Sequence, residues 1–114
     1  MHPKEVKEYF DEQNFVKKTA LQINKDLGGL SEYEINTEKI DKQSDTLNFF
    51  LTKLELALTD LVETNQLQQF IYLVDIPESE YLKSLTSGDL NALAFLVLRR
   101  EAKKVYLKMR FSQA

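Results

Sequence analysis

Apolar side chains recur every three or four residues through most of this chain, the spacing that places them on one face of an α-helix. The first stripe runs from about Pro3 to Leu27 and ends in the pair Gly28-Gly29. Proline suits the first turn of a helix, and glycine accepts the left-handed conformation that closes one. We therefore predict a long first helix. Its stripe consists of Val6, Tyr9, Gln13, Val16, Ala20, Ile23 and Leu27, with Phe10 and Leu21 beside it.

A second long helix is predicted after a connector over residues 30–36, where apolar and polar positions alternate weakly. Asn36 or Thr37 can cap this helix, and Asp45 offers a second start. Residues 37–44 are therefore either its first turns or a separate turn, and the sequence leaves open whether residues 30–44 are helical or extended. The helix is expected to end near Asn65. Its stripe is Ile40, Leu47, Leu51, Leu54, Leu58 and Leu61, with Phe50, Ala57 and Val62 beside it.

Two short helices are predicted next. The first covers about Gln66 to Val74 and directs Leu67, Phe70, Ile71 and Val74 inward. Pro77 then disfavours helical geometry in the residue before it and suits the start of the next helix. This second short helix is expected to end near Thr86, with Tyr81, Leu82 and Leu85 inward.

The last helix is predicted from Leu90 to about Phe111. Its first half is apolar on nearly every side, which is typical of a helix buried by several neighbours. At 1.5 Å per residue it is roughly 33 Å long, about the span of a small domain. We therefore expect one all-α domain over residues 1–114, a compact bundle of three long and two short helices with the C-terminal helix central.

A resemblance supports this fold. The run Phe70-Ile71-Tyr72-Leu73-Val74-Asp75-Ile76-Pro77, a short helix, Leu93-Ala94 to Arg99, and Lys103 to Tyr106 resemble a family of small, uncharacterised all-helical bacterial proteins. The similarity covers roughly residues 37–111. It implies a helical fold and carries no assigned activity.

Composition removes most catalytic chemistry from consideration. The chain has no Cys and one His, His2, so thiolate metal sites, cysteine nucleophiles and a conventional triad are excluded, and no metal or cofactor is expected. No Gly-x-Ser-x-Gly or phosphate-binding loop is present. An enzyme would need a deep polar pocket around an ionisable group such as Asp75, Tyr72 or Tyr81. We expect a non-enzymatic protein.

The location of the protein is predicted from its termini and its apolar runs. The first residues lead directly into charged sequence, without the apolar region of a secretory signal. The longest apolar run, residues 92–98, is much shorter than the roughly 20 residues of a membrane span. The sequence therefore favours a cytoplasmic protein.

The net charge of −3 is unevenly distributed. Residues 97–114 hold six basic side chains and one acidic side chain, Glu101, whereas the remainder holds nine basic and 17 acidic ones. The basic end is a candidate site for nucleic acid or another anion, although cations at a helix C-terminus also complement its dipole and the acidic body repels phosphate. The candidate residues are Arg99, Arg100, Lys103, Lys104, Lys108 and Arg110.

Three apolar side chains lie off the predicted stripes. Phe15 leaves the stripe of the first long helix, and Phe49 and Leu56 leave that of the second. A helix with two apolar faces is packed by several helices or by a second molecule. Our leading hypothesis is a small interaction protein that contacts itself, as a homodimer, or another protein through these residues. Nucleic-acid or anion binding through the basic helix is the alternative.

Overall fold

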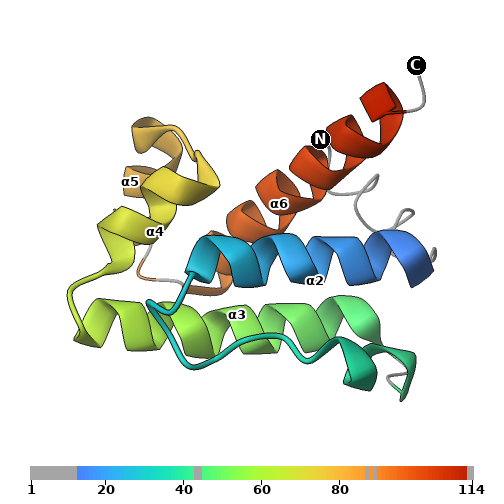
Figure 1. Cartoon of the computed structure of the whole chain (residues 1–114). Helices are drawn as coiled ribbons and strands as arrows, with labels where there is room; N and C mark the ends of the chain where they lie inside the picture. Colours follow the sequence, from blue (N-terminus) through green and yellow to red (C-terminus); the bar gives the residue numbers. More distant parts are fainter. Residues whose placement is uncertain (1–12, 43–44, 87, 89, 113–114) are drawn as a thin grey trace.

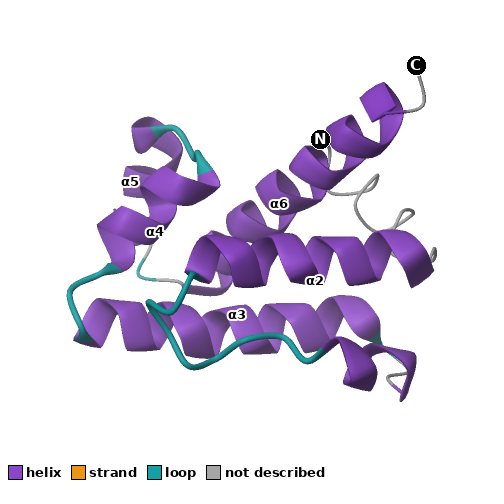
Figure 2. Cartoon of the chain, in the orientation of Figure 1, coloured by secondary structure: helices purple, strands orange, loops and turns teal. Residues whose placement is uncertain are grey.

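The computed structural model describes residues 13–42, 45–86, 88 and 90–112, and within them every regular element is a helix (Figure 2). Five α-helices and one short 3-10 helix follow one another along this part of the chain. They are α2 (Gln13–Leu27), η1 (Thr37–Lys42), α3 (Thr46–Glu63), α4 (Leu67–Val74), α5 (Glu78–Thr86) and α6 (Leu90–Ser112). The predicted all-α class, with three long and two short helices, is confirmed.

Helix α6 is the central element of the bundle. It packs against α2, α3, α4 and α5. Figure 1 shows α2 above α3, with α4 and α5 at one end of the pair and α6 crossing behind and rising away from α2 toward its C-terminus. The predicted central position of the last helix is therefore correct, and its C-terminal half leaves the body of the bundle.

The start of α3 settles one of the alternatives left by the sequence. The Asp45 carboxylate accepts a hydrogen bond from the backbone N–H of Asn48 at 3.1 Å, which caps the helix. Residues Thr37–Lys42 form the separate turn η1, in which the Glu38 N–H donates to the Asn36 side chain at 2.9 Å. The connector before it contains no strand.

That connector is fixed to α2 by a single side chain. The Asn24 amide donates to the carbonyl of Ile35 at 2.9 Å and accepts from the Ile35 N–H at 2.8 Å. An asparagine used in this way satisfies both backbone groups of an irregular segment as a neighbouring strand would. Ile35 is consequently held in the core although no regular element carries it.

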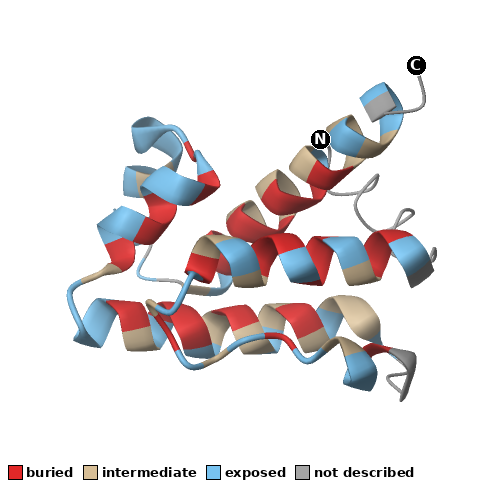
Figure 3. Ribbon diagram, in the orientation of Figure 1, coloured by how far each residue is buried: buried red, intermediate tan, exposed pale blue. Residues whose placement is uncertain are grey.

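The core forms one cluster drawn from all of these elements (Figure 3). Most predicted stripe residues that the structure describes lie in it, and it includes Phe15, Phe50 and Phe70. The predicted start of the first helix at Pro3, with Val6, Tyr9 and Phe10, lies outside the described residues. Among the helices of the described residues, none is long and apolar enough to cross a membrane.

The inward face predicted for α5 is only partly correct, because Tyr81 packs against the core whereas the two leucines are exposed. Leu82 and Leu85 are 50% and 39% exposed, Tyr81 is half-buried, and Ser84 is the buried residue of this helix. The Ser84 hydroxyl donates to the Glu80 carbonyl at 3.2 Å within the helix. Leu82 and Leu85 are left open to solvent, and most of α5 is pale blue in Figure 3.

Candidate functional site

Helices α2 and α6 run antiparallel and are joined by polar side chains that reach across their interface. The Lys104 ammonium donates to the Asp26 carboxylate at 2.7 Å and to the carbonyl of Leu73, at the end of α4, at 2.9 Å. One turn further along, the Lys108 ammonium donates to the Gln22 side chain at 2.7 Å. Gln22 donates in turn to Asp26 at 3.4 Å, so the four side chains form one chain of hydrogen bonds.

Glu101 lies in the same interface and has no exposed surface. Its Oε1 atom is 3.5 Å from the Lys104 ammonium, and neither carboxyl oxygen has a hydrogen-bond partner of acceptable geometry. Burying an unpaired carboxylate costs far more than burying a carboxylic acid, because the ion loses its hydration. The position therefore favours the neutral form of Glu101.

The two carboxyl groups have opposite pKa shifts. Burial, together with the neighbouring Asp26 carboxylate, raises the pKa of Glu101 to about 9, against the smaller opposing effect of Lys104. Burial also acts to raise the pKa of Asp26, but interactions with Glu101 and with the Lys104 ammonium outweigh it and the pKa lies below its ordinary value. At neutral pH the pair thus holds one proton, on Glu101, and one negative charge, which Lys104 balances.

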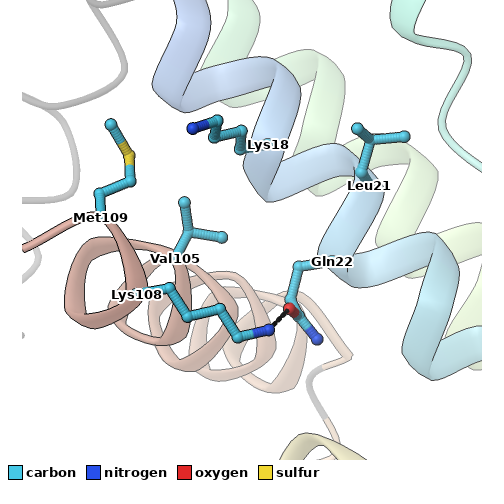
Figure 4. Close-up of a pocket in the computed structure, with 6 residues that line it drawn as sticks. All are labelled: Lys18, Leu21, Gln22, Val105, Lys108 and Met109. Carbon is cyan, nitrogen blue, oxygen red and sulfur yellow. Dashed lines mark hydrogen bonds between the residues drawn. The ribbon is translucent and has the colours of Figure 1, made fainter. Parts of the chain in front are cut away.

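A groove of about 360 Å³ opens beside this cluster, where α6 diverges from α2 (Figures 1 and 4). Its apolar side chains are Leu21, Val105 and Met109, of which Leu21 is 58% exposed. Each helix lines it with residues at positions i, i+3 and i+4, the spacing of one helix face. The groove is therefore a strip of apolar surface between two helices.

Among the described residues, the charged side chains that line the groove are both cationic, and Gln22 is its neutral polar side chain. Figure 4 shows Lys18 extending from α2 toward α6, and Lys108 bonded to Gln22 at the edge of the groove. Within the described part of the chain the Lys18 ammonium makes no hydrogen bond or ion pair. An ammonium has three donors, so Lys108 keeps donors for a further acceptor after its bond to Gln22. The groove joins an apolar floor to two cations.

A second hollow, of about 250 Å³, lies between the end of α3, α5 and the start of α6. None of the described residues that line it carries a charge. The residues around it are Val62, Ser84, Leu85, Gly88, Leu90 and Leu93.

Four of the six cations expected to bind anions donate hydrogen bonds within the molecule, three of them to another helix or its end. Lys104 and Lys108 make the bonds to α2 described above, and Arg100 donates to the backbone oxygen and carboxylate of Asp75 at 3.1 and 2.8 Å. Arg110 donates to the Tyr106 hydroxyl within α6 at 2.9 Å. Lys103 is exposed and Arg99 half-buried. Half of the basic side chains at this end of α6 therefore bind α2 or the end of α4.

The three residues predicted to form an interface are not brought together on one surface. Phe15 is 2% exposed and belongs to the core, so it cannot meet a partner. Phe49 is half-buried against Phe50, with ring centroids 6.3 Å apart. Leu56 is 43% exposed on α3. Phe15 leaves the predicted stripe because α2 is covered by more than one neighbour, the alternative that a second apolar face allowed.

The ionisable residues considered for catalysis are exposed, as Asp75 and Tyr72 are, or half-buried, as Tyr81 is. Asp75 ends α4 in the left-handed conformation, with φ 72°, and its pKa is lowered by the hydrogen bond and charge of Arg100. Tyr72 is exposed and Tyr81 half-buried. No group of three or more potential metal-ligating side chains occurs among the residues the structure describes.

The buried acid and the groove were both missed from the sequence. Glu101 was counted as one acid among six cations, although it lies three residues after Leu98 and four before Val105, on the apolar side of its helix. That placement is the available signal for a buried carboxyl. The groove requires knowing that α6 diverges from α2, which periodicity does not encode.

Comparisons of the chain with protein-family models, curated proteins and solved structures found no match. The resemblance to small helical bacterial proteins therefore stays a prediction, and the function rests on the geometry above.

Proposed function

We propose that this chain is a non-enzymatic interaction protein, and that the groove between α2 and α6 docks an acidic amphipathic helix of a protein partner. The observation that carries the proposal is the combination of an apolar floor, formed by Leu21, Val105 and Met109, with cations at Lys18 and Lys108. Helices that dock in grooves use apolar anchors on one face and matching charges beside them.

The non-enzymatic part of the proposal is supported by the position of the one strongly perturbed acid. Glu101 has a raised pKa, which in an accessible cleft suggests acid–base chemistry. Its side chain has no exposed surface, so a substrate cannot reach its proton while α2 and α6 remain packed. Its interactions with Asp26 and Lys104 instead suit a role in joining the two helices.

The proposal is tested with a synthetic peptide. A fluorescently labelled, stapled helix with leucines at i, i+4 and i+7 and flanking glutamates is titrated with the full chain, and its anisotropy is recorded. We expect saturable binding, weakened at least tenfold by the double variant K18E/K108E because like charges then face each other.

Lys103→Glu is the matched control, since it makes the same charge change on the exposed side of α6. It should leave the affinity within about twofold, the effect of a remote surface charge. An absence of binding, or an equal loss in both variants, would overturn the groove as the docking site.

A further inference from the structure

Helix α5 presents an unpartnered face whose chemistry complements the groove. Glu78, Leu82 and Leu85 follow one another at i, i+4 and i+7, which places them on one side of the helix. All three are exposed, the leucines by 50% and 39%. Leu85 borders the hollow beside Leu90 and Leu93, and the exposed part of this face has no covering element among the residues that the structure describes.

The groove and the exposed face of α5 are complementary in charge, and both carry apolar side chains. The groove offers lysines at two of its edges and an apolar floor, and α5 offers an acidic first turn followed by two leucines. Glu78 can meet Lys18 or Lys108 while Leu82 and Leu85 enter between the helices. Covering the two exposed leucines removes apolar surface from water, which favours the contact.

The two surfaces cannot meet within one molecule. Helix α5 packs at the N-terminal half of α6, whereas the groove is lined by its C-terminal residues Val105, Lys108 and Met109. Figure 1 shows α5 and the C-terminal end of α6 at opposite sides of the molecule. A complementary pair of separated surfaces joins different copies of a chain head to tail.

We propose that the occupant of the groove is α5 of a second copy of this chain, so that the protein associates head to tail. The inference rests on the proposed docking function of the groove and names its partner. A symmetric pairing of groove with groove is disfavoured, because it would place Lys18 and Lys108 against their own counterparts. Head-to-tail contact instead forms open chains or closed rings.

The test uses two full-length variants that each lose one half of the contact. K18E/K108E reverses the charge of the groove and keeps α5, and L82D/L85D disrupts α5 and keeps the groove. Sedimentation velocity of the unaltered chain should show masses above the 13.3 kDa monomer that increase with concentration. Each variant alone should remain a monomer.

Mixing the variants separates this inference from other kinds of association. An equimolar mixture pairs one intact groove with one intact α5, so we expect a one-to-one complex that grows no further. A mixture that stays monomeric while the unaltered chain associates would overturn the inference. Circular dichroism confirms that each variant is folded; if L82D/L85D is not, Glu78→Lys takes its place.

Leu56→Asp is the matched control, since Leu56 is a similarly exposed leucine outside both surfaces. It should leave association unchanged, and loss of association in this variant would place the contact on α3 instead. A chain that is monomeric at all concentrations but still binds the synthetic acidic helix refutes the head-to-tail contact alone. If neither association nor peptide binding occurs, the docking function fails as well.

Discussion

The ammonium of Lys104 lies 2.7 Å from the carboxylate of Asp26, 78 residues earlier in the chain. This contact joins the C-terminal helix to the first described one. Both side chains are largely covered, with 17% and 11% of their surface exposed. A covered ion pair contributes to stability only as long as neither partner is removed, because the remaining charge is then left without compensation.

Removing the charge of Asp26 should be partly compensated by Glu101. Asp26→Asn removes the carboxylate that adds to the burial of Glu101 in raising its pKa, so ionising Glu101, whose Oε1 lies 3.5 Å from the Lys104 ammonium, costs less than in the unaltered chain. We expect a loss of about 2 kcal/mol in the free energy of unfolding, the scale of a charged hydrogen bond. Urea denaturation at pH 7 measures it.

The double variant Asp26→Asn/Glu101→Gln should lower the free energy of unfolding by about 3–5 kcal/mol, because the covered Lys104 ammonium then has no carboxylate to pair with. Near pH 4.5, where the unfolded glutamate is still about half protonated, Glu101→Gln alone should change the free energy of unfolding by less than about 1 kcal/mol, because the amide replaces a neutral acid. At pH 7 it should raise the free energy of unfolding, because a glutamine in the unfolded chain gains nothing by ionising. The two single variants and the double variant form a double-mutant cycle. If the changes in the free energy of unfolding of the two single variants add up to that of the double variant, the two carboxyl groups do not share one proton.

Stability should fall as the pH rises from about 5 to 9. The pKa of Glu101 is about 9 in the folded chain, whereas an unperturbed glutamate has a pKa of 4.5, so the folded state binds the extra proton throughout this interval. Unfolding therefore releases a proton, and the free energy of unfolding decreases by up to about 1.4 kcal/mol per pH unit.

The pKa of Asp26 is shifted in the opposite direction, so its contribution is lost only as the pH falls below 3.8, outside this interval. Glu101→Gln should abolish most of the slope when thermal unfolding is followed at several pH values. An equal slope in both proteins would assign the titration to another group.

Asn24 should be needed to hold the connector. Asn24→Ala removes both hydrogen bonds to the backbone of Ile35 and leaves these partly buried groups unpaired, which costs about 2 kcal/mol. The Ile35 amide should also exchange its hydrogen much faster. Asn48→Ala, at an exposed position of α3, is the control and should have little effect on either measurement.

The basic helix end should act on stability more than on anion binding. Lys104→Ala should lower the urea midpoint, because it breaks the contacts to Asp26 and Leu73, whereas Lys103→Ala should shift stability by less than about 0.5 kcal/mol. Anisotropy with a labelled oligonucleotide at low salt should show no affinity that depends on Lys104. A steeply salt-dependent affinity lost in Lys104→Ala would favour the nucleic-acid alternative.

The helices could be predicted from the sequence because their information is local. The three-four spacing, Asp45 as a cap and the restart at Pro77 locate most ends to within a few residues. Where competing local signals existed, as over residues 37–44, the sequence defined the alternatives and the capping geometry of Asp45 decided between them.

The site could not be predicted because it depends on how helices pack. In α5 the buried residue is Ser84 while Leu82 and Leu85 are exposed, and nothing in these nine residues predicts that choice of face. The pairing of Lys104 with Asp26 and of Lys108 with Gln22 depends on the antiparallel register of α2 and α6. Individual residue types do not encode that register.

The docking groove is tested most directly by mapping where the synthetic acidic helix binds. In a ¹⁵N-labelled sample of the full chain, titration with that peptide should shift the amide signals of the groove residues most. These are Lys18, Leu21, Gln22, Val105, Lys108 and Met109. Shifts centred on Leu56 of α3, or on Arg99 and Lys103, would contradict the account.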